Sequence, residues 1–435
     1  MDEMVRSPRA VEAVITPPGD KSISHRAALL NSIADGNAHV SNFCVGDDRA
    51  SMLRCLRGLG AKIRRHAGCD ISGSDECFEI RGVGLDGLSE PGTALNAGNS
   101  GTTMRLVTGL LAAQPFFSVI TGDRSLRNRP MKRIATPLIS MGATISGRRD
   151  GSLAPLAVNG GNLHGIDYEM PVASAQLKSS ILIAGLYAEG RTTVRQPALS
   201  RDHTERMMGA MGADVVTEDL NVTVRPSRLK SINVNVPCDI SGASFWMVAG
   251  CCHPNARVRV KSVGINPSRA GVLEVLQSMG AKLTLENVVE AGGEPSADIV
   301  AESSDLVGIE LSGDIIPRII DEIPVLALAA CFARGTTVIR DAGELRVKES
   351  DRISATVDGL RRLGASIEET DDGMIIKGGA RLRGAACEGF GDHRIAMTMG
   401  IAGLVADGET TVVGAEAASV SYPEFWDTLR GIQDG

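Results

Sequence analysis

A short phrase recurs five times along the chain, and its recurrence limits the folds that the chain can form. Each copy is the end of an amphipathic helix, then Gly-Ala, then the start of a strand: LRGLGAKI, LISMGATI, MGAMGADV, LQSMGAKL and LRRLGASI. Glycine commonly follows a helix because it enters the left-handed conformation without a steric penalty. These helices carry Arg and Lys, so the phrase predicts surface helices that are each followed by a strand.

A second phrase recurs six times, out of phase with the first. It is a helix rich in Ala, Leu and Ile, usually followed by Gly and a Thr/Val strand, and its copies begin at Ser22, Ser100, Ser174, Ser241, Asp321 and Asp392. These helices are apolar on nearly every face, which predicts that they are buried.

The alternation of the two phrases defines a repeat of buried helix, strand, surface helix and strands, present in six copies. Three copies can close one domain around their buried helices. The sequence therefore predicts an α/β (α+β) fold with two similar domains and a break near residue 236. A chance recurrence of Gly-Ala after helices is the alternative, and it does not explain why the two phrases stay in register.

The starts of the six buried helices are polar or Gly-rich. A helix N-terminus presents free N–H groups and a partial positive charge, so anions bind there readily. Ser, Asp and Asn are also common N-cap residues, and for Ser241 we prefer that interpretation. Basic residues gather near several of the other starts, including those in GDRSLRNRPMKR and ELRVKESDR. Because Arg binds both oxygens of a phosphate or carboxylate, we expect one anion site built from distant segments.

Composition excludes several classes of protein. The net charge is −7 and aromatic residues are 3% of the chain, which argues against a nucleic-acid-binding protein. No basic segment followed by an apolar stretch opens the chain, and no uncharged apolar run reaches the length of a membrane span. The nine cysteines form no CxxC pair. We therefore expect reduced thiols and a cytoplasmic protein.

Six motifs in order along the chain carry a specific resemblance: GDKSISHR, GNSGTTMRL, GDRSLRNRPM, SAQLKS, ELRVKESDR and GDHRIAM. Together they resemble the 5-enolpyruvylshikimate-3-phosphate synthase (3-phosphoshikimate 1-carboxyvinyltransferase) family over essentially the whole chain. The resemblance implies an enolpyruvyl transferase-like fold, an inside-out α/β barrel, with residues 20–236 as the shikimate 3-phosphate side. Residues 1–19 and 237–435 would form the phosphoenolpyruvate side with the catalytic acid and base.

The resemblance also implies the activity, which is transfer of enolpyruvyl from phosphoenolpyruvate to the 5-hydroxyl of shikimate 3-phosphate with release of phosphate. This is a step of chorismate and aromatic amino acid biosynthesis, and the family is the target of glyphosate. The implied partners are these two small molecules, with no nucleic acid, membrane, cofactor or metal, and we expect a monomer.

Site residues carry over motif by motif. The resemblance implies that the following residues bind shikimate 3-phosphate: Lys21, Ser22, Arg26, Ser174, Ala175, Gln176, Ser200, Arg201, Asp321 and Lys348. It implies that a second, overlapping set binds phosphoenolpyruvate: Lys21, Asn99, Gly101, Arg129, Gln176, Arg352 and Arg394. The family often has Ser at the position of Ala175, so a backbone contact would serve there. Two further positions depart from the family pattern, namely Leu106 where many members have Pro and Val420 where many have a basic residue.

The chemistry requires an acid and a base, because the enol methylene carbon gains a proton while a hydroxyl attacks the neighbouring carbon. We expect Asp321 to act as base on the 5-hydroxyl. Glu349, with Lys21 nearby, is the expected proton donor to the methylene carbon.

Two alternatives compete with this assignment. UDP-N-acetylglucosamine 1-carboxyvinyltransferase shares the fold and chemistry, but that family carries a Cys in the loop before Arg-Pro, whereas GDRSLRNRP has none. A non-catalytic clamp of α/β repeats would need a basic inner surface, whereas the buried helices are apolar. An inactive relative would lack the catalytic set, and Lys21, Asp321 and Glu349 are all present.

Overall fold

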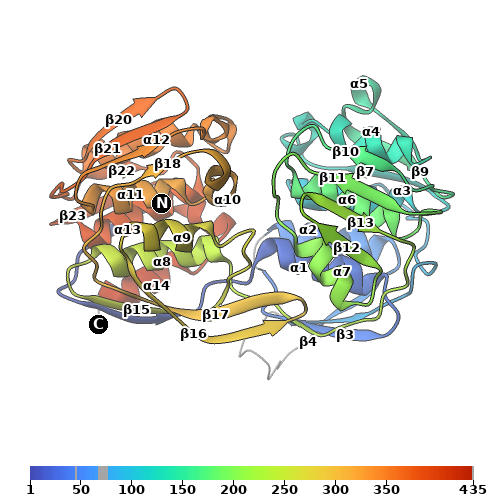
Figure 1. Cartoon of the computed structure of the whole chain (residues 1–435), viewed down its shortest axis with the longest axis horizontal. Coiled ribbons are helices and arrows are strands. Elements are labelled where there is room, and N and C mark those ends of the chain that lie inside the picture. Colours follow the sequence, from blue (N-terminus) through green and yellow to red (C-terminus); the bar gives the residue numbers. More distant parts are fainter. Residues whose placement is uncertain (45–46, 67–76, 434–435) are drawn as a thin grey trace. The chain divides into compact units, whose positions relative to one another are not determined.

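The computed structural model describes residues 1–44, 47–66 and 77–433, and these residues form two compact units (Figure 1). Unit 1 comprises Met1–Pro18, Cys238–Val289 and Pro295–Gly435, and unit 2 comprises Gly19–Pro237 with Glu290–Glu294. The predicted α/β fold class is confirmed. The assignment of one substrate to each domain stays a prediction.

Within the described part of unit 2, three four-stranded sheets share one connectivity: β14-β3-β5-β4, β6-β7-β9-β8 and β10-β11-β13-β12. In each sheet the first two strands are parallel and the remaining neighbours are antiparallel, as with Leu95 opposite Ile120 and Phe117 opposite Asn159 in the second sheet. The strands are β3 (Asn37–Ser41), β4 (Lys62–His66), β5 (Cys77–Arg81), β6 (Leu95–Asn96), β7 (Phe117–Thr121), β8 (Thr144–Gly147), β9 (Leu153–Asn159), β10 (Asp167–Glu169), β11 (Thr192–Arg195), β12 (Val215–Glu218), β13 (Asn221–Val224) and β14 (Val234–Asn235).

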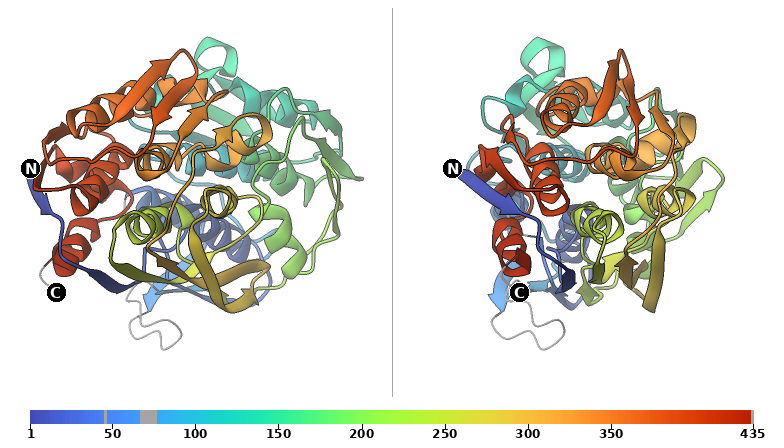
Figure 2. Two further views of the ribbon diagram at one scale, coloured as in Figure 1. Left: turned by 60° about the vertical axis from the view of Figure 1, so that its left-hand side comes forward. Right: turned by 90° about the vertical axis from the view of Figure 1, so that its left-hand side faces the viewer.

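The described part of unit 1 repeats this connectivity in β2-β15-β17-β16 and β18-β19-β21-β20, and a three-stranded sheet β22-β23-β1 completes it. Its strands are β1 (Asp2–Arg6), β2 (Val11–Ile15), β15 (Ala256–Gly264), β16 (Lys282–Ala291), β17 (Glu294–Glu302), β18 (Glu310–Leu311), β19 (Thr336–Ile339), β20 (Ser366–Thr370), β21 (Gly373–Lys377), β22 (Ala386–Glu388) and β23 (Glu409–Val413). Strand β1, at the blue end of the chain, pairs antiparallel with the red β23 (Figure 2). The N-terminal residues therefore complete two sheets of unit 1.

Each repeat contains one buried helix. These helices are α1 (Lys21–Ser32), α3 (Gly101–Ala112) and α6 (Ala175–Gly185) in unit 2, and α8 (Ile240–Cys252), α11 (Ile323–Phe332) and α13 (His393–Val405) in unit 1. In α8 nearly every residue is buried, because Phe, Trp, Met, Val and Cys leave no polar face for solvent. A Cβ at Gly109 of α3 would lie 2.4 Å from the carbonyl oxygen of Ser180, so this glycine permits close packing of α3 against α6.

The remaining helices do not belong to the buried helices of either unit. They are α2 (Asp47–Gly58), α4 (Lys132–Ser140), α5 (Arg148–Gly151), α7 (His203–Ala210), α9 (Gly271–Ser278), α10 (Ile316–Ile319), α12 (Arg352–Arg362) and α14 (Phe425–Gln433), with short 3-10 turns η1 (Leu126–Asn128), η2 (Gly313–Ile315), η3 (Gly343–Val347) and η4 (Ala415–Val420). The five repeated glycines that follow surface helices have positive φ, between 88° and 115°, as predicted for glycine after a helix: Gly60, Gly142, Gly212, Gly280 and Gly364.

Among the residues that the structure describes, seven buried cysteines are outside any disulfide: Cys44, Cys55, Cys238, Cys251, Cys252, Cys331 and Cys387. Burial raises the pKa of the Cys44 and Cys331 thiols to about 12, so these thiols stay protonated at neutral pH. Cys77 is disulfide-bonded, so the expectation of reduced thiols is wrong for this residue.

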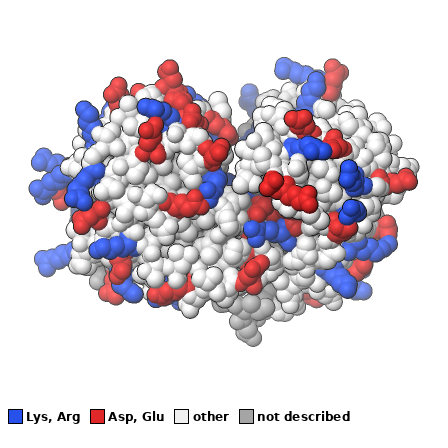
Figure 3. Space-filling view, in the orientation of Figure 1, with Lys and Arg blue, Asp and Glu red and all other residues white. Residues whose placement is uncertain are grey.

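On the face shown in Figure 3, basic side chains are interspersed with acidic ones. Acidic residues outnumber basic residues in the chain as a whole. None of the helices in the described residues is long and apolar enough to cross a membrane.

Candidate active site

The start of α1 positions the first group of predicted residues in unit 2. Asp20 caps the helix, because its carboxylate accepts a hydrogen bond from the backbone N–H of Ile23 at 2.9 Å. Lys21 is exposed and Ser22 is half-buried at the helix N-terminus. Arg26 follows one turn later and is only 2% exposed.

The Arg26 guanidinium is held by three oxygens. It donates to Thr204 Oγ1 at 2.6 Å and to Ser179 Oγ at 2.7 Å, and its third bond goes to the carbonyl oxygen of Ser22 at 3.0 Å. Burial lowers the pKa of Arg26 to about 10, and the Glu205 carboxylate opposes that shift. Arg26 is therefore charged at neutral pH and fixed behind Ser22.

The start of α6 lies against the same arginine, since Ser179 belongs to this helix. Ser174 caps α6 by accepting from the backbone N–H of Leu177 at 3.4 Å, and Ala175 is the first helical residue. The carbonyl oxygen of Ser200 accepts from Lys178 Nζ at 3.2 Å. The charge of Arg201 contributes to lowering the pKa of Arg26, so the two guanidinium groups are near one another. Unit 2 thus gathers its predicted phosphate-binding residues around α1 and α6.

A second group in unit 2 surrounds the start of α3. Arg129 Nη2 donates to Asn99 Oδ1 at 2.6 Å. A Cβ added to Gly101 would lie 3.2 Å from Arg105 Nη1 and 3.4 Å from Arg129 Nη1, so both arginines converge on this glycine. Arg105 also donates to Gln176 Oε1, which joins this group to the start of α6.

Arg105 is a site residue that sequence reasoning did not assign. Burial lowers its pKa to about 10, and the neighbouring charges of Arg133 and Arg129 act in the same direction. An anion between these guanidinium groups would relieve their mutual repulsion. The available signal was the position of Arg105 one turn into a helix with a Gly-rich start.

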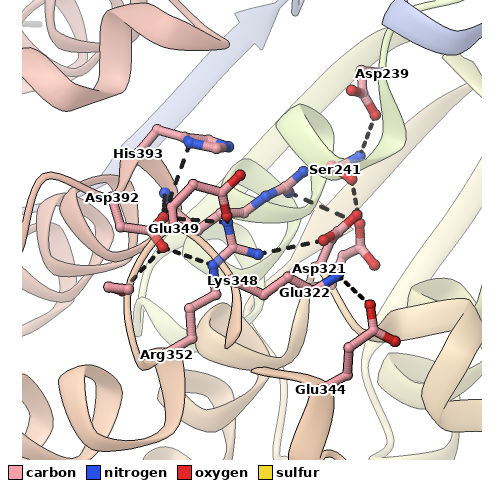
Figure 4. A network of polar contacts seen from close by, with 12 residues as sticks. Asp239, Ser241, Asp321, Glu322, Glu344, Lys348, Glu349, Arg352, Asp392 and His393 are labelled. Carbon is pink, nitrogen blue, oxygen red and sulfur yellow. Dashed lines mark hydrogen bonds and ion pairs between the residues drawn. The ribbon is translucent and has the colours of Figure 1, made fainter. Parts of the chain in front are cut away.

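Unit 1 gathers its predicted catalytic residues around the guanidinium of Arg352, which is 1% exposed (Figure 4). Arg352 donates to Asp392 Oδ2 at 2.8 Å, to Glu349 Oε2 at 2.6 Å and to Asp321 Oδ1 at 3.4 Å. The two carboxyl groups expected to act as base and acid therefore contact one cation. The cap of α13 fixes Asp392, because its carboxylate also accepts from the backbone N–H of Arg394 at 2.9 Å.

The pKa values of Arg352 and Asp392 shift in opposite directions. Burial acts to lower the pKa of Arg352, but its hydrogen bond to Asp392 and the nearby carboxylates outweigh burial and raise it. For Asp392, burial acts to raise the pKa, while the hydrogen bond and charge of Arg352 hold it below the ordinary value. Both groups are therefore ionised at neutral pH.

Glu322 is a second residue that sequence reasoning did not assign. Its buried carboxylate accepts from Ser241 Oγ and lies 3.5 Å from Arg269 Nη2 and 4.0 Å from Arg394 Nη1. The interpretation of Ser241 as an N-cap is wrong, because Asp239 caps α8 by accepting from the backbone N–H of Ser241 at 2.9 Å. Ser241 instead lies one residue inside the helix and contacts Glu322 (Figure 4). Its hydroxyl oxygen also accepts from Arg269 Nη2 at 2.7 Å.

The other predicted residues of unit 1 lie in or beside this network. Lys348 Nζ donates to Glu344 Oε1 at 2.8 Å, and Arg394 is the second residue of α13. The two departures from the family pattern lie in different settings, with Leu106 fully buried in α3 of unit 2 and Val420 66% exposed at the end of η4 in unit 1.

Comparisons with known proteins identify the family of the chain. The family model of EPSP synthase (3-phosphoshikimate 1-carboxyvinyltransferase) matches residues 5–429. A 3-phosphoshikimate 1-carboxyvinyltransferase of Roseiflexus castenholzii is 50% identical over 433 residues, covering 98% of this chain and 99% of the relative. A protein of the same description from Citrifermentans bemidjiense is 52% identical over 429 residues and covers 98% of both chains.

Solved structures give the same result. The EPSP synthase of Acinetobacter baumannii is 44% identical with a TM-score of 0.92, covering 99% of this chain and 98% of its own. The enolpyruvyl transferase NikO of Streptomyces tendae is 18% identical with a TM-score of 0.77 and covers 99% of this chain and 96% of its own, which shows a shared fold. The chain therefore belongs to the EPSP synthase (3-phosphoshikimate 1-carboxyvinyltransferase) family.

Proposed function

We infer that the chain transfers the enolpyruvyl group of phosphoenolpyruvate to the 5-hydroxyl of shikimate 3-phosphate and releases phosphate. The observation that carries this inference is the identity of about 50% to curated 3-phosphoshikimate 1-carboxyvinyltransferases along nearly the full length of both chains. The reaction is a step of aromatic amino acid biosynthesis.

We propose that the groups at α1 and α6 bind the phosphate of shikimate 3-phosphate. Helix N-termini and hydroxyl groups are suited to a phosphate, and Ser22, Ser174 and Ala175 lie at two such N-termini. Lys21 and Arg201 would add positive charge, while Ser200 and Gln176 would add polar contacts. Arg26, predicted as a ligand of this phosphate, would complete the group from beneath Ser22. Asp321 and Lys348 of unit 1 would contact the rest of this substrate.

Phosphoenolpyruvate carries a carboxylate and a phosphate, and it needs several cations. We propose Lys21, Arg129, Arg352 and Arg394 for these contacts, with Asn99, Gly101 and Gln176 beside them. The convergence of Arg105 and Arg129 on Gly101 supports this assignment, because a glycine lets an anion approach both guanidinium groups without steric hindrance.

In the proposed mechanism Asp321 accepts the proton of the 5-hydroxyl while the oxygen attacks the substituted enol carbon. Glu349 donates a proton to the methylene carbon, which becomes a methyl group, and a tetrahedral adduct forms. In the elimination the Glu349 carboxylate takes back one methyl proton and Asp321 gives up its proton with the leaving phosphate, which restores the double bond in the product and both side chains to their starting state. Arg352 would hold both carboxylates in place, so that orientation of acid and base contributes much of the rate.

The test is phosphate release by the purified chain with each substrate alone and with both together. Release only with phosphoenolpyruvate and shikimate 3-phosphate together is expected. Absence of release, or release with UDP-N-acetylglucosamine in place of shikimate 3-phosphate, would contradict the proposal.

We also propose that the chain is a cytoplasmic monomer. Seven buried cysteines outside any disulfide, within the described part of the chain, support a reducing compartment. Light scattering after gel filtration should give a mass near 45.6 kDa, and a mass of twice that value would contradict the monomer.

A further inference from the structure

A buried ion pair lies beside the proposed phosphate-binding residues of unit 2, and none of the predicted site residues belongs to it. Lys178 Nζ lies 2.6 Å from Glu205 Oε1, and the two side chains are 1% and 5% exposed. Lys178 is on α6, one turn after Ser174, and Glu205 is in the first turn of α7. The pair therefore joins two helices beneath their polar ends.

Each member of the pair is next in sequence to a residue that holds Arg26. Ser179 follows Lys178 and accepts from Arg26 Nη2, whereas Thr204 precedes Glu205 and accepts from Arg26 Nε. The two hydroxyl oxygens are 2.6 Å apart. A shift of α6 relative to α7 would therefore move both partners of Arg26 as well as the ion pair.

Lys178 also reaches the second proposed phosphate-binding segment directly. Its Nζ donates to the carbonyl oxygen of Ser200 at 3.2 Å. Ser200 and Arg201 lie between β11 and α7, where regular secondary structure does not fix the backbone. The hydrogen bond from Lys178 is thus a partly buried, charge-assisted restraint on this segment.

The buried positive charges around Arg26 explain why an acidic residue is present at position 205. Arg26 and Lys178 are two buried cations, and the carboxylates of Glu205 and Glu294 both act to raise the pKa of Arg26. Glu294 Oε1 lies within hydrogen-bonding distance of His203 Nδ1, at 2.8 Å. Glu205 therefore permits burial of Lys178 and Arg26 at one place.

Stability alone is a poor explanation for such a pair. Replacing a buried ion pair by apolar residues of similar size is often neutral or stabilising, since the desolvation cost offsets the attraction. A role in placing functional groups explains why charged residues occupy this position.

We propose that Lys178, held by Glu205, is a positioning residue for the phosphate of shikimate 3-phosphate. Lys178 fixes the Ser200–Arg201 segment through the Ser200 carbonyl and fixes Arg26 through the α6–α7 contact. The proposal rests on the proposed function. It predicts a selective contribution to recognition of the phosphate group, and little contribution to recognition of the shikimate ring.

The experiment compares binding of shikimate 3-phosphate and of shikimate by calorimetry, without phosphoenolpyruvate. The double variant Lys178→Met/Glu205→Met removes both charges of the pair together, and the Glu294 carboxylate remains to balance Arg26. We expect its affinity for shikimate 3-phosphate to fall about tenfold or more, as for loss of a charged hydrogen bond. Affinity for shikimate should change less than about threefold, and the unfolding temperature should stay near that of the unaltered protein.

A second pair of variants keeps the test decisive if the double Met variant does not fold. Lys178→Gln/Glu205→Gln retains a polar pair, but its shorter side chain at 178 does not reach Ser200, so the same loss is expected. Glu205→Gln alone leaves the Lys178 ammonium without its carboxylate, so we expect a lower unfolding temperature and a loss of affinity for shikimate 3-phosphate of about tenfold or more.

The matched control is the exposed pair of Arg195 and Asp167 in the same unit, whose side chains are 52% and 47% exposed. The variant Arg195→Met/Asp167→Asn should bind both ligands normally. Unchanged binding of shikimate 3-phosphate by the 178/205 double variants, or an equal loss for both ligands, would overturn the inference. If the unaltered protein itself did not bind shikimate 3-phosphate, the proposed function would fail and this inference with it.

Discussion

Asp321 and Glu349 both contact the guanidinium group of Arg352, at 3.4 Å and 2.6 Å from its terminal nitrogens. The two residues come from different segments, Asp321 just before α11 and Glu349 just before α12. Arg352 is in turn fixed by buried Asp392. The candidate base and the candidate acid are thus held by one rigid cation, and their roles can be separated by substitution.

Asp321→Asn should lower kcat by about 10²- to 10⁴-fold, because an amide cannot accept the proton of the 5-hydroxyl. The amide oxygen still accepts from Arg352, so the dissociation constant of shikimate 3-phosphate should change less than about threefold. Steady-state kinetics and calorimetry measure the two quantities. Asp314→Asn, at an exposed position in η2, is the control and should be normal. A turnover number near normal for Asp321→Asn would remove Asp321 as the base.

Glu349→Gln should lower kcat by about 10²-fold or more, since its amide cannot donate a proton of comparable acidity to the methylene carbon. The variant should also slow exchange of the methylene protons of phosphoenolpyruvate with solvent, which NMR in D₂O detects. Exposed Glu424→Gln should exchange at the normal rate. Exchange at the normal rate in Glu349→Gln would assign the proton donor elsewhere.

Asp392 should make the stability of unit 1 sensitive to acid. Arg352 holds the pKa of folded Asp392 below its ordinary value of 3.8, so the stabilisation is fully present above that pH. It is lost as the pH falls through the lower pKa of the folded state. The unfolding temperature of Asp392→Asn should therefore fall less steeply below pH 3.8 than that of the unaltered protein. Asp407→Asn, in an exposed pair with Arg381, should keep the steep dependence, and equal slopes for all three proteins would contradict this role of Asp392.

Gly101→Ala should raise KM for phosphoenolpyruvate with little change in KM for shikimate 3-phosphate. Its methyl group would lie 3.2 Å from Arg105 Nη1 and 3.4 Å from Arg129 Nη1, which is tight enough to displace one of these groups. We expect an increase of about tenfold, as for a weakened charged hydrogen bond. Gly92→Ala is the matched control, because a Cβ there meets no atom within 4 Å. An equal rise in both KM values would argue against a phosphoenolpyruvate site at Gly101.

Local signals in the sequence predicted the repeats well. The apolar composition of segments such as the one at Ile323–Phe332 predicts burial on all faces, and glycine after each surface helix predicts a left-handed residue such as Gly364. These features depend on residues within one turn or one strand of each other. The fold class was therefore accessible before any tertiary contact was known.

Contacts between distant segments could not be predicted in this way. The sequence placed Ser241 at a helix start but did not reveal that Glu322 and Arg269 contact its hydroxyl group. Nor did any periodicity indicate the pair of Lys178 and Glu205, because it depends on how α6 packs against α7. Part of the hairpin β16–β17, Glu290–Glu294, belongs to unit 2, and that too depends on tertiary packing.

The most direct test of addition and elimination at these residues is one reaction in D₂O with phosphoenolpyruvate and shikimate 3-phosphate. The account predicts equal amounts of phosphate and enolpyruvyl product, with deuterium on the vinyl carbon of the product, because a methyl group forms and then loses one proton. Mass spectrometry and NMR of the product measure this incorporation. Phosphate release without an enolpyruvyl product, or a product without vinyl deuterium, would contradict the account.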